Sequence, residues 1–85
     1  MRITKPTLDD ECLKLVEKMG LVYGWNVGQY SLRSENGMYL LVRWENGGYT
    51  TPISSTYRTA KEMYDTMYFA RQVLGFVSQR QEATK

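Results

Sequence analysis

The chain has 85 residues, 42% of them hydrophobic, and carries 11 basic against 9 acidic side chains, one Cys and no His. This length suits one small domain. Without His and with a single Cys, the usual zinc-ligand sets and the catalytic triads that use His as a base are excluded. The net charge of +2, with its signs interleaved, supplies neither a polybasic run nor an acidic face that would imitate a nucleic-acid backbone.

The apolar stretches are short, about four or five residues at most, which is too few for a transmembrane helix or the hydrophobic part of a signal peptide. We therefore expect a cytoplasmic protein that does not bind membranes. The lone Cys12 has no partner within the chain and suits a reducing compartment. The residue types predict no metal, no cofactor and no enzymatic activity.

The first predicted element is an amphipathic helix over residues 7–19. Thr7 is the expected N-cap, the acidic residues 9–11 favour the first turn, and Gly20 is the natural stop. At 100° per residue, four apolar side chains fall on one face; they are Leu8, Cys12, Leu15 and Met19.

Three features of the sequence superficially suggest chemistry. Adjacent acidic residues on a helix point about 100° apart, so residues 9–11 favour a helix start over a metal site. Cys12 lies on the apolar face with no His to activate it, which favours a buried hydrophobe over a nucleophile. The glycine-rich segment 46–48 lacks the strand-to-helix context and the Lys of a phosphate loop.

Three antiparallel strands are predicted next, over residues 25–33, 38–44 and 49–53, because β-branched and aromatic residues dominate there. The dipeptides Asn36-Gly37 and Asn46-Gly47 suit tight hairpin turns, since Asn and Gly accept positive φ. The resulting sheet is a meander.

Two residues interrupt the strand pattern. Gly28 predicts a bulge or a close backbone approach within the first strand. Pro52 has no N–H for a sheet ladder, so the third strand lies at an edge or ends there.

The last element is a helix over residues 59–78, followed by a polar, frayed tail at 79–85. Thr59 and Glu62 have the spacing of a capping box, a specific start signal. Apolar side chains gather on one side of this helix; they are Ala60, Met63, Tyr64, Met67, Ala70, Leu74 and Val77.

The order α-β-β-β-α predicts an α+β domain in which the C-terminal helix covers one face of a three-stranded antiparallel meander. The short N-terminal helix then lies either beside the second helix or over a sheet edge.

A second apolar stripe runs along the far side of the last helix, where Phe69, Val73 and Phe76 recur at i, i+4 and i+7, with Tyr68 beside them. Three interpretations compete. The first helix packs on this stripe, or Gly75 ends the helix and folds Phe76 back. Otherwise the stripe is exposed and binds a partner or forms a symmetric dimer.

The second strand offers an alternative surface. If Leu40, Val42 and Trp44 form the core face, the opposite face presents aromatic and Arg side chains that can stack bases and contact phosphates. An ordinary half-buried sheet fits the same pattern, since no Lys cluster flanks the patch. The candidate nucleic-acid-binding residues are Tyr30, Arg33, Tyr39 and Arg43.

The preferred interpretation is a non-enzymatic protein-interaction module that acts by occupying a partner's surface. Short stand-alone regulators and inhibitors, those of phages and other mobile elements among them, are often of this size. The partner-binding candidates are Tyr68, Phe69, Val73 and Phe76, with self-association included. The alternative is a nucleic-acid-binding protein that uses an open sheet face.

Overall fold

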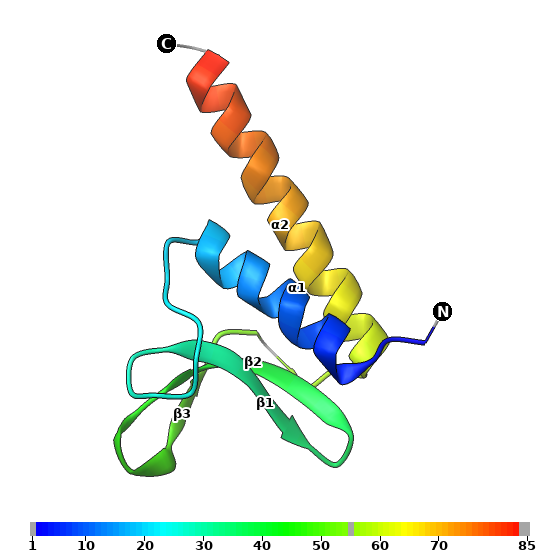
Figure 1. Ribbon diagram of the computed structural model, residues 1–85, viewed down its shortest axis with the longest axis vertical. Coiled ribbons are helices and arrows are strands. Elements are labelled where there is room, and N and C mark those ends of the chain that lie inside the picture. Colours follow the sequence, from blue (N-terminus) through cyan, green and yellow to red (C-terminus); the bar gives the residue numbers. More distant parts are fainter. Residues whose placement is uncertain (1, 55, 84–85) are drawn as a thin grey trace.

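The computed structural model describes residues 2–54 and 56–83, with side chains as far as Phe76. Two helices and a three-stranded antiparallel sheet of order β1-β2-β3 make up the chain (Figure 1), which confirms the predicted α+β class and element order. The elements are α1 (Lys5–Lys18), β1 (Tyr30–Glu35), β2 (Met38–Trp44), the 3₁₀ turn η1 (Asn46–Gly48), β3 (Thr50–Pro52) and α2 (Ala60–Ala83).

Both helices lie over one face of the sheet, and α1 occupies the central place. It packs on α2 and on β1, whereas the main contact of α2 with the sheet is with β2. Leu8, Cys12 and Val16 of α1 are fully buried. They join a core cluster completed by Leu15, Leu32, Leu41, Met63 and Met67.

The strand register decides which sheet face meets this core. Leu32 pairs with Leu41, and both belong to the core cluster. The condition that Leu40, Val42 and Trp44 form the helix-facing side, on which the nucleic-acid-binding alternative depended, is therefore not met. Strand β2 is apolar on both faces, so alternation alone could not identify the correct one.

The opposite face of the sheet is nevertheless partly covered. Leu40 and Val42 are buried there, and Val42 pairs with Pro52 of β3. The Trp44 indole N–H donates to the Ser31 hydroxyl at 2.7 Å, which satisfies a fully buried Ser. This face is consequently not the solvated side of a half-buried sheet.

Helix α1 begins two residues before its predicted start. Thr4, rather than Thr7, is the N-cap, and its hydroxyl accepts the Thr7 amide N–H at 3.4 Å. Pro6 is tolerated in the first turn, where its missing N–H has no intrahelical partner to lose. The acidic residues 9–11 therefore lie beyond the first turn. The predicted stop is confirmed, because Gly20 follows the helix with φ +77°.

The first turn of the meander matches its prediction and the second does not. Asn36 and Gly37 adopt φ values of 53° and 75° in a two-residue hairpin between β1 and β2. The second connection is a longer loop in which Gly47 and Gly48 take positive φ and the Glu45 N–H donates to the Tyr49 carbonyl. The turn thus contains Asn46 and Gly47 but is a three-residue loop, one residue longer than predicted.

Strand β1 starts later than predicted, at Tyr30, and residues 25–29 form a loop. The irregularity expected at Gly28 is confirmed. Gly28, with φ +83°, donates its N–H to the Trp44 carbonyl, and Gln29 accepts the Trp44 N–H. Two residues opposite one define a β-bulge. The short strand β3 ends at Pro52, as predicted.

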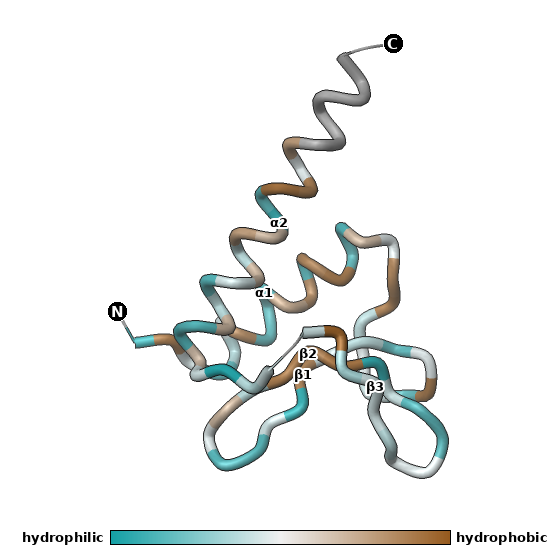
Figure 2. Tube along the Cα trace, turned by 180° about the vertical axis from the view of Figure 1, so that it is seen from behind, coloured by the Kyte–Doolittle hydropathy of each residue, from teal (hydrophilic) through white to brown (hydrophobic). Residues whose placement is uncertain are grey.

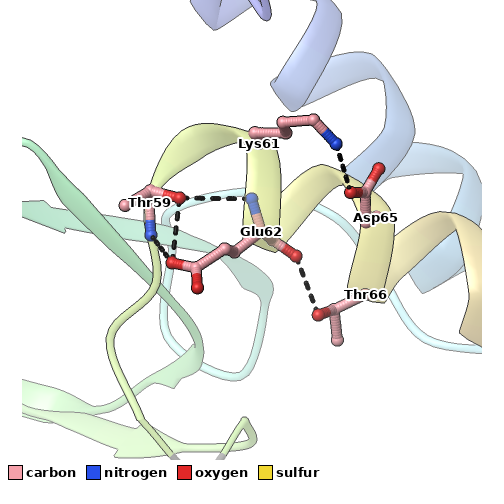
Figure 3. A network of polar contacts seen from close by, with 5 residues as sticks. All are labelled: Thr59, Lys61, Glu62, Asp65 and Thr66. Atoms are coloured by element: carbon pink, nitrogen blue, oxygen red, sulfur yellow. Dashed lines mark hydrogen bonds and ion pairs between the residues drawn. The ribbon is translucent and has the colours of Figure 1, made fainter.

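The capping box at the start of α2 is confirmed (Figure 3). The Thr59 amide N–H donates to the Glu62 carboxylate at 3.1 Å, and the Glu62 amide N–H donates back to the Thr59 hydroxyl at 3.3 Å. The Thr59 amide N–H and the Thr59 hydroxyl both donate to the Glu62 carboxylate and lower its pKa below the ordinary value. A Lys61–Asp65 ion pair and a bond from the Thr66 hydroxyl to the Glu62 carbonyl reinforce the first turns (Figure 3).

Helix α2 continues past its predicted end. It runs through Gly75 to Ala83, so residues 79–83 belong to the helix and not to a frayed tail. Residues 84–85 and the side chain of Val77 lie outside the described part of the chain. Within that part, neither helix combines the length and apolarity that crossing a bilayer requires.

The core assignment predicts unequal effects of two truncations. Leu8→Ala should lower the free energy of unfolding by about 3 kcal/mol, because the Leu8 side chain is fully buried and its removal leaves a cavity. Val22→Ala, at a side chain that is 60% exposed, should change it by less than about 0.5 kcal/mol. Urea unfolding followed by circular dichroism measures both, and equal effects would contradict the proposed core.

Candidate functional site

The second apolar stripe of α2 is exposed. Phe69, Val73 and Phe76 are 70%, 43% and 64% exposed, and we call them the apolar ridge. Helix α1 packs on another side of α2, which rules out the first of the three interpretations. Helix α2 continues through Gly75, which rules out the second. The exposed-stripe interpretation is the one that the structure retains.

An apolar groove of about 470 Å³ adjoins this ridge. Three parts of the fold form its walls. They are Leu15 and Met19 of α1, Leu41 of β2 together with Ile53 after β3, and the middle of α2. Phe69 and Val73 belong both to the ridge and to the groove wall. A convex and a concave apolar surface are therefore continuous with each other.

The ridge leads from the groove toward the part of α2 that projects past α1, since Gly75 still lies beside Lys18 at the end of α1. Figure 1 shows α2 extending well past the end of α1, and Figure 2 shows hydrophobic positions on α2 beyond that level. The two helices have 14 and 24 residues, which correspond to about 21 and 36 Å at 1.5 Å per residue. No described residue outside α2 covers Phe76 enough to bury it.

Tyr68 lies on a different flank of α2 from the groove. It is 45% exposed, its ring stacks on Tyr64 at 6.2 Å, and the Arg71 guanidinium lies 5.4 Å from its ring centre. Successive helical residues point about 100° apart, so Tyr68 diverges from the neighbouring Phe69. We therefore separate Tyr68 from the other three partner-binding candidates.

An ion pair between the helices fixes this arrangement. Arg71 of α2 donates to both carboxylate oxygens of Glu11 on α1, at 2.7 and 3.1 Å. The Glu11 side chain is 4% exposed and that of Arg71 27% exposed. The bond to Glu11 raises the pKa of Arg71 above its ordinary value.

Sequence reasoning missed this pair by assigning Glu11 to a solvated first turn. The available signal was its position, because Glu11 is three residues after Leu8 and four before Leu15 and so shares their face. A carboxylate on a packing face requires a cation opposite it.

The alternative nucleic-acid set does not form one surface. Register places Tyr30 beside Arg43 on the helix-facing side, where Tyr30 and Tyr39 pack against the core, whereas Arg33 pairs with Leu40 on the opposite face. Both Arg side chains also have partners: Arg43 binds Glu45 at 2.5 Å, and Arg33 donates to the Thr50 hydroxyl at 2.9 Å.

A further exposed apolar group lies in the loops beside the sheet and was not predicted. Val22, Trp25 and Val27 precede β1, and Tyr49 precedes β3; all four are more than half exposed. The Trp25 ring packs edge-on against Tyr23 at 5.2 Å. These residues provide matched controls for the ridge.

Cys12 is a core residue, as predicted. Its side chain is fully buried, and desolvation, with a smaller effect of the Asp9 charge, raises the pKa of its thiol from 9.0 to about 12. Such a thiol lacks the lowered pKa of a nucleophile. In the described part of the chain, no three Cys, Asp or Glu side chains gather as they would around a metal ion.

Comparison with protein-family models, with curated proteins and with solved structures finds no match for this chain. The ridge and the groove are therefore the features from which a function is proposed.

The burial of Cys12 predicts that its thiol is unreactive in the native protein. Ellman's reagent at pH 8 should label it at least about 100-fold more slowly than in denaturing urea, because labelling needs an opening of the core. An added exposed thiol in Tyr49→Cys should react at once. Equal native rates for both thiols would contradict the burial of Cys12.

The ion pair predicts coupled effects. Arg71→Met should lower the free energy of unfolding by about 2 kcal/mol, because it leaves the buried Glu11 carboxylate without its partner. The double variant Glu11→Leu/Arg71→Met should recover most of this loss, since it removes both charges. A double-mutant cycle from urea unfolding measures the coupling, and strictly additive effects would contradict it.

Proposed function

We propose that the protein is a protein-interaction module that binds an apolar helical segment of a partner on the apolar ridge and groove of α2. The observation that carries the proposal is the exposure of Phe69 and Phe76, at 70% and 64%, on a helix that projects from the body. Aromatic side chains are enriched among the residues that dominate binding energy at protein interfaces.

The shape of the surface favours a helical segment. An apolar groove is the form into which amphipathic helices dock through residues at i, i+3, i+4 and i+7, and this groove is bounded by both α1 and α2. Here the groove runs beside α2, and its lining residues are uncharged. The partner is therefore expected to present apolar side chains flanked by polar ones, and binding is expected to depend little on salt.

The residues that line the groove include no catalytic group. Its polar lining residues are Ser54 and Thr66, and the Ser54 hydroxyl accepts a hydrogen bond from the Leu41 amide N–H at 3.1 Å. These groups can fix the register of a bound segment. They supply no acid, base or nucleophile with an activating partner, which supports binding over catalysis.

The proposal predicts crosslinks to a partner at one surface. A photo-crosslinking phenylalanine analogue placed at Phe69 in the native cell should trap that partner, and the same analogue at the equally exposed Tyr49 should not. The trapped protein, once identified and purified, should bind the wild-type chain directly. Phe69→Asp should weaken this binding at least tenfold, which corresponds to about 1.4 kcal/mol.

Tyr49→Asp is the matched control and should leave the affinity unchanged. Both substitutions are at exposed side chains, so the free energy of unfolding should change by less than about 0.5 kcal/mol. Identical adducts from both positions, or an affinity that is insensitive to Phe69→Asp, would refute the proposed surface.

A further inference from the structure

We infer that the helical segment bound by the ridge and groove is α2 of a second copy of this chain, so that two copies form an antiparallel, two-fold symmetric dimer. This inference rests on the proposed function, because it names the occupant of the same surface. Three observations favour a second copy over a foreign helix.

The first observation is that the surface is self-complementary. An isologous interface needs the same patch to provide both the projection and the cavity that receives it. The ridge projects and the groove is hollow, and Phe69 and Val73 belong to both. With a two-fold axis at Val73, the midpoint of the ridge, Phe76 of each copy lies beside Ala70 of the other, which lines the groove.

The second observation concerns charge. Antiparallel symmetric pairing brings residues near the two-fold axis close to their own copies, so like charges at the centre of the patch would repel. The groove lining is uncharged, and the nearest charges on α2 flank it. Asp65 is paired with Lys61 at 2.8 Å and Arg71 with Glu11 at 2.7 Å, so both are neutralised within one chain.

The third observation is the area available. Two phenylalanines at 70% and 64% exposure leave on the order of 250 Å² of aromatic surface per copy. Two copies would therefore cover about 500 Å² of it, a large share of the roughly 1,200 Å² that the smallest specific interfaces bury. Met19, Ile53 and Val73, each more than a third exposed, enlarge the patch. A reversible dimer of moderate affinity is expected.

The projecting end of α2 also favours a second copy as the occupant. The end of α2 after Gly75 has eight residues, about two turns. An isolated helix of this length is marginal in water, because most helical stability comes from packing. Two antiparallel copies of α2 would lay each projecting end along the body of the other. The part of α2 beyond α1 would then be packed on both copies instead of standing alone (Figure 1).

Sedimentation equilibrium of the whole chain, from about 1 to about 500 μM, tests the dimer across the range expected of a small interface. The wild-type mass should rise from one to two copies, with little change between low and high salt. Phe76→Asp should raise the dissociation constant at least tenfold. Tyr49→Asp, an equally exposed aromatic outside the patch, should leave it unchanged.

Disulfide trapping tests the orientation. A Val73→Cys variant should link to itself under mild oxidation, because residues on a two-fold axis meet their own copies. Phe76→Cys should not, since its two copies would be about 9 Å apart along an antiparallel pair, beyond the Cα separation of about 7 Å that a disulfide allows. A parallel pair would link both variants and overturn the antiparallel arrangement. Tyr49→Cys should form no intermolecular disulfide in either the antiparallel or the parallel arrangement.

The outcomes separate the two proposals. A monomer at every concentration, with no Val73→Cys link, overturns the dimer. If photo-crosslinking at Phe69 then identifies another protein that binds the purified chain, the proposed function stands with a different occupant. If it identifies none, both proposals fail.

Discussion

The position of α1 determines the rest of the molecule. Because Leu8, Cys12 and Val16 are fully buried between β1 and α2, α1 takes the space over the sheet that a single covering helix would otherwise fill. Helix α2 then meets the core mainly through Met63 and Met67 in its first half. Its last turns, after Gly75, extend past α1 (Figure 1). The apolar ridge is exposed.

The Glu11–Arg71 pair fixes the rotation of α2 about its own axis. A carboxylate with 4% exposure is costly unless it is paired, so Arg71 must face α1. This orientation holds Tyr68 under the guanidinium and leaves the ridge on the opposite flank, beside the groove. The ridge cannot be buried by turning α2 without breaking that pair. The polar contact that holds the helices together is thus the one that keeps the aromatic face open.

What the sequence predicted well has local causes. Three such features depend only on residues close together in the sequence. They are strand β2 at Met38–Trp44, the Asn36-Gly37 turn and the Thr59–Glu62 capping box. The start of α1 was misplaced because Thr4 and Thr7 are both good N-caps and Pro6 fits either first turn. Local chemistry did not discriminate between them.

What it could not predict depends on tertiary packing. The helix-facing side of β2 could not be assigned because Leu40, Leu41 and Val42 are all buried, so alternation gives no direction. The ridge residues were named from their spacing, but three interpretations stayed open, since only the place of α1 decides among them. The Glu11–Arg71 pair joins residues 60 positions apart. No local pattern pairs residues over that distance.

The cost of the exposed ridge bears on why such a chain would retain it. Within one copy, covering Phe69 and Phe76 would require α1 to leave the core, which would expose Leu8, Cys12 and Val16 in exchange. Such an exchange loses more apolar burial than it gains, because each α1 residue is already fully buried and the phenylalanines already keep a third of their surface covered. The described segments of one copy therefore do not bury the ridge without that loss, which is the physical ground of the proposed interaction surface.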